Sequence, residues 1–368
     1  MRRPNVVAQL QQYRRQHGRR DVAADPSSEC PMVNPQGAKY RSLFLGLSVI
    51  VLGLGALSAM DVRNLTYTGF QTDGNNKVIA VERGGPAAAA GLQVGDVLSS
   101  VNGVAVTDTR GVSNQRRADV GAGWPYVVQR GTQTVNLTIT QAPLPPRYGY
   151  VRRAGTLLGL CYLGFTLWAY IAAPGAATTL LALVGQSFGL LFLNVPYFES
   201  PVVRIAVTSI LLVIISLGFA ALVHFLLAFP TRRPLLDRPF GTTVLYGPAV
   251  VLSLIFVGFT ILRPDSSSAV NIFLRTASNL VIAGYFLAAI ILVFRRYLAA
   301  TPTDRAAHGL GLMLAGVIIG LGPLLAAGIV TLLSPSTFLP LSQFYFLTLG
   351  LIPVAFATAA VRSARAGG

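Results

Sequence analysis

The chain has 368 residues, of which 53% are hydrophobic and only 11% are charged. Soluble domains carry about a quarter charged residues, so this composition argues against an ordinary soluble protein and indicates a membrane protein. Lys and Arg outnumber Asp and Glu by 29 to 13, which gives a net charge of +16. The arginines lie mainly in the N-terminal segment and beside apolar runs, as positive-inside topology requires, so we expect no nucleic-acid partner.

Residues 1–41 are polar and basic and show no sustained apolar period, which predicts a mostly disordered cytoplasmic tail. A short helix over Asn5–His17 is compatible with the pattern. Residues 42–60 are uncharged and apolar, long enough to cross a bilayer core of about 30 Å at about 1.5 Å per residue. Because a basic tail precedes this first span, we expect the N-terminus in the cytoplasm and the next segment outside.

Residues 61–142 differ from what surrounds them, because charges return and apolar residues alternate with polar ones. Pro86–Ala90 followed by Gly91 predicts a short helix, and Asn102-Gly103 predicts a tight turn. About 80 residues are enough for a small soluble domain. We expect strands over four segments: Val78–Arg83, Val97–Val101, Tyr126–Arg130 and Thr134–Thr140.

Residues 152–362 predict a bundle of seven further spans, and residues 363–368 a short cytoplasmic tail. With the first span, this makes eight. The short Pro174-Gly175 break is the place where two of these spans could instead be one. Arginines follow the fourth, sixth and eighth spans, which places those ends in the cytoplasm. Arg147, Arg152 and Arg153 fall on the outer side, against the rule. The seven uncharged runs are Ala154–Ala173, Ala176–Phe198, Ile205–Pro230, Phe240–Leu262, Thr276–Phe294, Gly309–Leu333 and Leu341–Val361.

The segment from Gly85 to Gly103 reads GPAAAAGLQVGDVLSSVNG, and it resembles the core of bacterial PDZ domains such as those of HtrA-type and site-2 proteases. The resemblance covers about residues 62–142, and its motif is long and gapless. It implies a small α+β domain inserted after the first span of an α-helical polytopic membrane protein. PDZ domains bind an extended peptide by adding a strand to a sheet edge, and backbone amides hold the terminal carboxylate.

Thr66-Tyr67-Thr68-Gly69-Phe70 stands where the family has its carboxylate loop. The resemblance implies that Gly69 lets backbone N–H groups point at the anion and that Phe70 lines the apolar pocket. The alternative is a strand-entry turn with a buried Phe. The second wall of the groove is expected near Asp108–Asp119, where Gly111 and Arg116-Arg117 match the family poorly. A domain that only packs on the membrane part or a partner therefore stays open.

Two motifs in the spans carry a second resemblance. His224-Phe225-Leu226-Leu227-Ala228-Phe229-Pro230 ends the fourth span, and Leu351-Ile352-Pro353-Val354-Ala355-Phe356-Ala357 leads to Val361-Arg362. Both resemble the sensor regions of bacterial histidine kinases and related serine phosphatases, and a PDZ domain after the first span resembles ComP-type quorum-sensing kinases. The resemblance covers roughly residues 42–362. In those families a kinase or phosphatase domain follows these motifs, whereas the sequence here ends at Gly368. We therefore expect either a stand-alone sensor-like protein or a piece of a longer one.

Polar side chains within the spans are candidates for an intramembrane site. Gln186 and Asn279 could line a ligand cavity or hold helices together, and the second role is favoured. His224 lies near a helix end, where bonding to a neighbour is favoured over a functional role. Gly316 and Gly320 predict close helix packing, and Pro353 predicts a kink in the last helix.

The sequence does not favour an enzyme. The three histidines form no His-Glu-x-x-His metal motif, and paired intramembrane carboxylates are absent. Gly185-Gln186-Ser187 fits a rhomboid-type context without other support. Cys30 and Cys161 give no disulfide or metal pattern, so we expect no cofactor.

These features predict a sensor or receptor in the bacterial inner membrane, with both termini cytoplasmic and the PDZ domain outside. It would recognise a peptide, a protein C-terminus or a lipophilic signal and report to a cytoplasmic kinase or regulator. The alternative is a non-catalytic adaptor of a membrane protease or envelope complex. Membrane lipid is an expected partner, and a homodimer is compatible with the sequence. A transporter is less well supported, since no internal repeat is evident.

Overall fold

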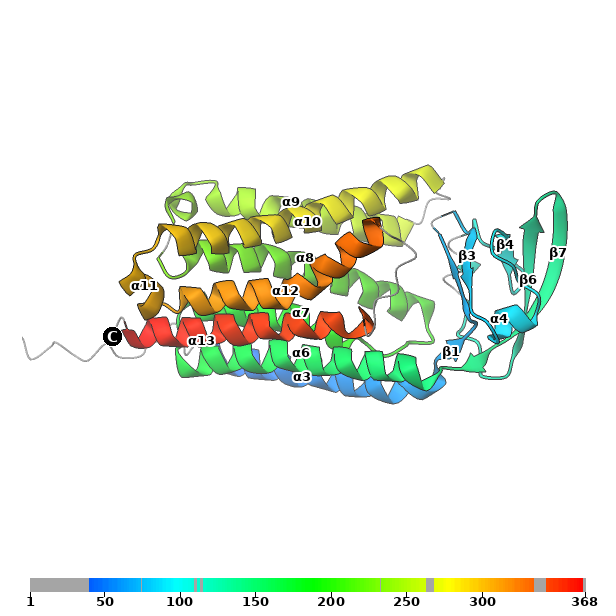
Figure 1. Ribbon diagram of the computed structural model, residues 1–368, viewed down its shortest axis with the longest axis horizontal. Helices are drawn as coiled ribbons and strands as arrows, with labels where there is room; N and C mark the ends of the chain where they lie inside the picture. Colours follow the sequence, from blue (N-terminus) through cyan, green and yellow to red (C-terminus); the bar gives the residue numbers. More distant parts are fainter. Residues whose placement is uncertain are drawn as a thin grey trace, which may run out of the picture.

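A computed structural model of the chain describes residues 40–366 except Gly74, 109–110, 113–114, Arg232, 263–267 and 334–341. The expected N-terminal tail lies outside these residues apart from its last two positions, and so does the helix considered over Asn5–His17. Two parts follow each other along the long axis of the molecule, a helix bundle and a small β domain at one end (Figure 1).

Within the described residues, eight helices are long and apolar enough to cross a membrane, which agrees with the number expected. The Pro174-Gly175 break separates two of them, as predicted. The α-helices of the bundle are α3 (Arg41–Asp61), α6 (Pro146–Ala172), α7 (Ala176–Leu193), α8 (Pro201–Ala228), α9 (Gly241–Leu262), α10 (Ser268–Ala299), α12 (Leu310–Leu333) and α13 (Leu351–Ala366). Shorter segments are η1 (Val62–Asn64), η2 (Pro234–Asp237), α11 (Pro302–Ala307) and η3 (Ser342–Gly350).

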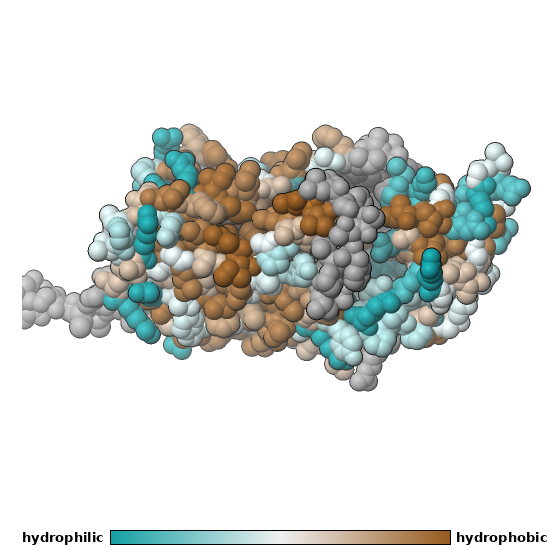
Figure 2. Space-filling model, in the orientation of Figure 1, coloured by the Kyte–Doolittle hydropathy of each residue, from teal (hydrophilic) through white to brown (hydrophobic). Residues whose placement is uncertain are grey.

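The surface of the bundle is apolar around its middle. Large side chains such as Val49, Leu254 and Leu280 are each 68% exposed, which in water would be costly. Figure 2 shows hydrophobic colour over the middle of the bundle and hydrophilic colour at its far end and on the β domain. This distribution is the one that a multi-pass membrane protein needs.

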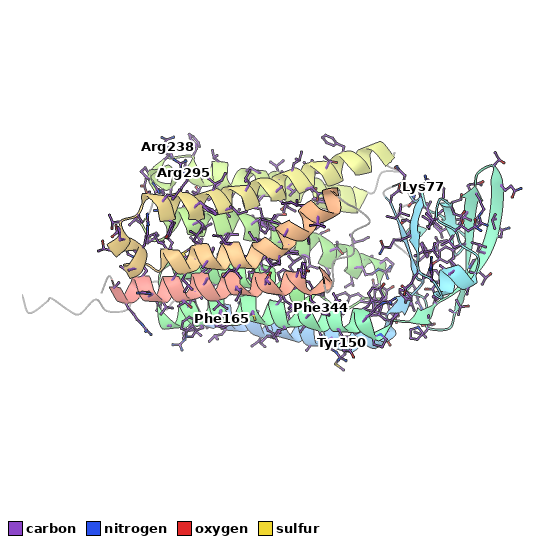
Figure 3. All side chains as sticks on the ribbon, viewed as in Figure 1. Lys77, Tyr150, Phe165, Arg238, Arg295 and Phe344 are labelled. Carbon is purple, nitrogen blue, oxygen red and sulfur yellow. The ribbon has the colours of Figure 1, made fainter. Side chains whose placement is uncertain are left out.

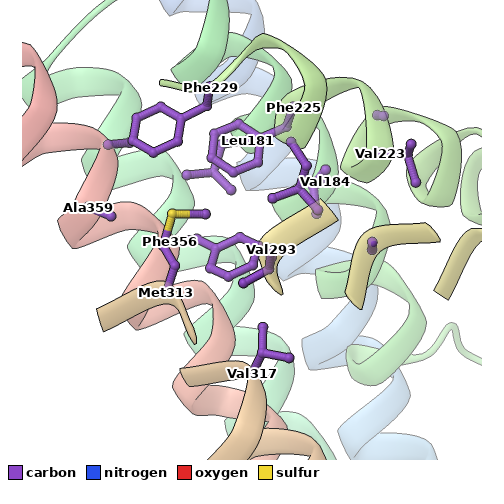
Figure 4. Close-up of a cluster of buried hydrophobic side chains, with 14 of the residues drawn as sticks. Leu181, Val184, Val223, Phe225, Phe229, Val293, Met313, Val317, Phe356 and Ala359 are labelled. Carbon is purple, nitrogen blue, oxygen red and sulfur yellow. The ribbon is translucent and has the colours of Figure 1, made fainter. Parts of the chain in front are cut away.

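Aromatic residues fill the bundle where α8 meets α13 (Figure 4). The rings of Phe225 and Phe356 are stacked with centroids 5.8 Å apart, and Phe225 is fully buried. Phe229 stacks on Phe225 at 5.4 Å. The two motifs His224–Pro230 and Leu351–Ala357, far apart in sequence, are therefore packed against each other in the core.

Glycines bring α12 close to α13, as the sequence predicts. A Cβ added to Gly316 would lie 2.5 Å from Ala355 Cβ, and one added to Gly320 would lie 2.9 Å from Ile352 Cγ1. Thr348 Oγ1 also donates to Gly320 O at 2.7 Å. Only residues without a side chain allow this approach, which is the usual role of small residues between membrane helices.

The last span differs from the continuous, kinked helix that was expected. A 3₁₀ segment, η3, runs to Gly350, and the α-helix begins at Leu351. Pro353 thus lies in the first turn of α13, where its missing N–H has no intrahelical acceptor to lose. The irregularity is a change of helix type before Pro353, and the predicted kink at Pro353 is wrong.

The β domain is built from antiparallel strands in three small sheets. A four-stranded sheet has the order β5-β4-β6-β7, β2 pairs with β3, and β1 pairs with β8. All four expected strand segments are present, Val97–Val101 with the expected bounds and the other three with shifted ends. The elements are β1 (Thr66–Tyr67), β2 (Phe70–Thr72), β3 (Val78–Val81), α4 (Pro86–Ala89), β4 (Val97–Val101), β5 (Val104–Ala105), β6 (Gly123–Arg130), β7 (Gln133–Thr140) and β8 (Ala142–Pro143).

Local features of the β domain follow the sequence prediction. Asn102 and Gly103 have φ of 50° and 80° and connect β4 to β5, as a two-residue hairpin turn requires. The short helix α4 begins at Pro86, and its small side chains allow Ala87 to be fully buried beside Val78, Val128 and Ile139. The domain therefore has its own hydrophobic core.

An ion pair fixes the segment after α4 to the sheet. Arg130 donates to both carboxylate oxygens of Asp96 at 2.8 Å and to Gly91 O at 2.8 Å. Gln93 N–H also donates to Asp96, whose side chain is only 1% exposed. The Arg130 guanidinium and this backbone bond outweigh the effect of burial and hold the pKa of Asp96 below its usual value.

Candidate functional site

The expected carboxylate loop forms a tight turn between β1 and β2. Thr66 and Tyr67 pair with Pro143 and Ala142 of β8. Thr68 O accepts a hydrogen bond from Ala87 N–H at 2.9 Å, and Gly69 O accepts one from Glu82 N–H at 2.8 Å.

Gly69 cannot easily be replaced in this turn. Its φ of +78° is in the left-handed region, and an added Cβ would lie 3.3 Å from Tyr67 Cε1 and in ordinary contact with Gly85 and Pro86. The backbone conformation therefore favours glycine.

Phe70 packs into the core of the β domain. Its ring lies edge-to-face on Tyr126 with centroids 5.9 Å apart, and it contacts the buried cluster around Val78 and Val128. The strand-entry alternative thus accounts for this ring without an open pocket. The role of the loop in holding a carboxylate stays a prediction.

The backbone N–H and C=O groups of Phe70 face away from β3. Phe70 is opposite Val81, and the hydrogen bond from Glu82 N–H to Gly69 O makes this the non-hydrogen-bonded type of antiparallel pair. In such a pair the N–H and C=O of both residues face outward. Among the described residues β2 pairs only with β3, so its outer edge has the geometry needed to add a strand.

The second wall of the expected groove is a single helical turn in its described part. Gly111 and Val112 are helical, and Asp108 accepts from both of their N–H groups at 2.7 and 2.9 Å. A Cβ on Gly111 would lie 2.3 Å from Asp108 Oδ2 and 2.7 Å from Val104 Cγ1. The glycine that matched the family poorly therefore has a steric reason.

Arg117 joins the β domain to the bundle. Its guanidinium makes two hydrogen bonds of 2.8 Å to the carboxylate of Asp61, the last residue of α3. The same guanidinium lies 4.2 Å from the ring centroid of Tyr197, in the α7–α8 connection. Arg117 N–H donates to Tyr197 Oη at 2.9 Å, and Tyr197 N–H donates to Asp61 at 3.3 Å. Three segments of the chain thus meet at this junction.

Further arginines strengthen the junction. Arg204 of α8 donates to Tyr197 Oη and to Gln115 O, the latter at 3.3 Å. Arg147 pairs with Glu82 of the β domain, and Arg152 donates to Ser58 Oγ of α3 at 2.6 Å. Two of the three arginines that the sequence analysis expected on the outer side, Arg147 and Arg152, therefore hold the domain and the first span in place.

A cavity of about 490 Å³ lies at this junction. Its lining combines the second wall of the β domain with the bundle, including Val112, Gln115, Arg116, Trp124 and Tyr197. The sequence analysis did not anticipate this site. Its signal was the poor match of Arg116-Arg117 to the family, which these bundle contacts explain in part.

The structure does not bring the three predicted polar residues of the spans together. Gln186 donates to Ser48 Oγ at 2.6 Å and connects α7 to α3, as its helix-holding role predicts. His224 Nδ1 lies 3.2 Å from Tyr246 Oη and connects α8 to α9. Asn279 lies on the exposed face of α10. A shared intramembrane site and both roles considered for Asn279 are therefore not supported.

An apolar cavity of about 180 Å³ lies instead inside the bundle. Aromatic side chains from α6, α7, α8, α10 and α13 surround it, among them Tyr162, Phe188, Phe219, Phe286 and Phe356. Its volume is close to that of engineered cavities that bind benzene. Sequence reasoning missed it because these aromatic residues are spread over the chain.

The fold defines a helical membrane protein that carries a small antiparallel interaction domain. Residues 77–114 match the family described as the PDZ domain. The matched part runs from β3 through β5 into the second wall of the groove, while the loop at Gly69 precedes it. A comparison with curated proteins finds no match. The chain is thus a membrane protein with a protein-interaction domain of the PDZ type.

Proposed function

We propose that the protein is a membrane sensor that recognises a peptide or protein C-terminus through its PDZ domain and reports binding to the helix bundle. The observation that carries this proposal is the junction between Arg117 and Asp61. The second wall of the groove contacts the end of α3 directly. A ligand that moves this wall therefore has a physical connection to the spans.

The peptide would bind as an added strand on the outer edge of β2. The outward N–H and C=O of Phe70 provide the first pair of main-chain hydrogen bonds, and the turn at Gly69 provides the backbone of a carboxylate site. The apolar cavity beside Phe219 and Phe356 supports a lipophilic signal as a second kind of input.

The output would pass along α8 and α13, since the stacked rings of Phe225 and Phe356 join the two sensor-like motifs. Arg238 and Arg295 lie at the end of the bundle away from Lys77 of the PDZ domain (Figure 3). This placement supports a cytoplasmic far end in a bacterial inner membrane, with the PDZ domain outside. A ComP-type role with a cytoplasmic kinase or regulator, in a monomer or a homodimer, follows from the resemblance. We further propose that the chain itself is not an enzyme.

A library of C-terminal peptides tests the PDZ part on the full chain in lipid nanodiscs. Gly69→Ala should weaken binding of any peptide that binds the wild type about 5- to 30-fold, because it strains the left-handed turn of the carboxylate loop by about 1–2 kcal/mol. Gly131→Ala is the matched control, since Gly131 also has a positive φ, of +61°, but nothing lies within 4 Å of an added Cβ. If no terminal peptide binds the wild type, the peptide-sensor proposal fails.

An adaptor for a membrane protease or envelope complex is the second candidate, favoured by the interaction domain itself. Co-purification from membranes separates the two functions. A sensor should bring down a kinase or regulator, and an adaptor should bring down a protease or secretion component.

A further inference from the structure

A second polar cavity, of about 420 Å³, lies at the end of the bundle opposite the PDZ domain. It is enclosed by the segment after α8, the end of α10, α11 and the start of α12. Its charged or titratable lining residues are Arg233, Arg296, Asp304 and His308. None of these residues contributes to the function proposed above.

Arg296 is a buried cation whose hydrogen-bond partners are all neutral. The residue is only 9% exposed. Its guanidinium donates to Thr231 Oγ1 at 3.1 Å, to Thr231 O at 2.7 Å and to Leu227 O at 3.0 Å. Its Nε is buried without a partner among the described residues.

Buried charges in proteins are normally paired, because removing a cation from water costs several kcal/mol. The carbonyls at the end of α8 offset part of this cost, since a helix C-terminus carries about half a negative charge. The remainder of the positive charge has no counter-ion among the described residues.

The other lining residues do not supply that counter-ion. Asp304 is exposed, and its carboxylate accepts from Thr301 Oγ1 at 2.7 Å at the beginning of α11. Its carboxylate lies beyond ion-pair distance of Arg233 and Arg296 among the described contacts. His308 Nδ1 lies 2.7 Å from Ser363 Oγ of α13. Two guanidinium groups thus face one cavity with a single, separately bonded carboxylate.

We propose that this cavity binds the phosphate of an anionic phospholipid head group. Arginine pairs suit phosphate because their planar donors match its oxygens. Basic pockets between membrane helices are typical head-group sites. The cavity lies at the end of a bundle whose exposed surface is apolar, so a lipid bound there by its head group has apolar protein surface in the membrane for its acyl chains.

The test uses the delipidated full chain in detergent, with native mass spectrometry and thermal unfolding as readouts. The probes are phosphatidylglycerol, phosphatidylcholine and inorganic phosphate. The wild type should retain phosphatidylglycerol and gain stability from it over phosphatidylcholine. Arg233→Gln should weaken that preference about fivefold, as expected for about 1 kcal/mol per arginine. Arg296→Gln should weaken the preference for phosphatidylglycerol as well. If that variant does not fold, the result for Arg233→Gln, a change at a half-buried residue, tests the proposal alone.

Arg295→Gln is the matched control, because Arg295 is exposed on the same helix, next to Arg296, and does not line the cavity. It should keep the preference of the wild type. Equal losses in Arg233→Gln and Arg295→Gln would mean general surface attraction and would overturn the site. Equal stabilisation by inorganic phosphate would overturn the lipid as its source while supporting phosphate binding. Absence of any preference in the wild type would overturn the proposal.

Discussion

Arg117 in the β domain and Asp61 at the end of the first span form a bidentate ion pair, with both N–O distances 2.8 Å. The pair is only 20% and 18% exposed, so water screens it less than a surface pair. It joins the groove wall directly to the first membrane helix, and its loss should loosen the coupling between their motions.

Asp61→Asn should loosen this junction by about 1–3 kcal/mol, since hydrogen bonds to a charged group are lost and Arg117 keeps an unpaired charge. Hydrogen exchange of residues 115–117 should become faster, while the core strands β6 and β7 stay protected. Asp119→Asn is the control, because Asp119 is exposed in the same segment of the PDZ domain. Equal exchange in the two variants would contradict a structural role for the pair.

Gly316→Ala should destabilise the bundle by about 1–3 kcal/mol, as overpacking a close contact does. The new methyl would lie 2.5 Å from Ala355 Cβ and push α12 away from α13. Gly322→Ala is on the same helix with open space around the new Cβ, and it should be neutral or slightly stabilising. Thermal unfolding in detergent compares the two, and similar midpoints would argue against this packing.

The eight spans and the strands of the PDZ domain could be predicted because their signals are local. A run of apolar residues, an alternation of polar and apolar positions, or an Asn-Gly turn depends on neighbours in the sequence. The outcome for Gly316 and Gly320 also followed from their spacing on one helix.

Contacts between distant residues could not be predicted in this way. Asp61 and Arg117 are 56 positions apart, and no local sequence pattern around either residue predicts that they pair. Asn279 was expected to face a ligand or another helix, because it is a polar residue in an apolar run. It is exposed instead, since the face that a residue occupies depends on how α10 packs. The structure has a turn at Gly69 between β1 and β2, but the packing of Phe70 depended on Tyr126 in another strand.

Tyr285→Phe tests an unusual feature of α9, a tyrosine hydroxyl from α10 that bonds to the α9 backbone next to Pro248. Tyr285 Oη donates to Leu245 O at 2.7 Å and accepts from Ala249 N–H at 3.1 Å, so the hydroxyl is inserted into the helix ladder. Removing it should cost about 1–2 kcal/mol, since two buried backbone groups lose a partner. Tyr150→Phe, at an exposed ring, is the control. Equal unfolding midpoints for the two variants would contradict the inserted hydroxyl.

The Arg130–Asp96 pair predicts that the PDZ domain loses stability in acid. The folded pKa of Asp96 is lowered from 3.8, mainly because Arg130 donates to its carboxylate. Ionised Asp96 therefore favours the folded state at every pH above about 4, and this contribution disappears as the pH falls from there through the folded pKa. Trp124, which packs on the domain core, reports unfolding by fluorescence once Trp168 of the bundle is replaced by Phe.

Asp96→Asn should be less stable than the wild type at neutral pH, because Arg130 loses its charged acceptor, and its stability should change less between pH 5 and pH 2. Other carboxylates titrate in the same range, so the comparison with Asp119→Asn isolates the Asp96 contribution. That exposed variant should keep the acid profile of the wild type. If Asp96→Asn and the wild type lose stability in parallel as the pH falls, the ion pair does not cause the acid sensitivity.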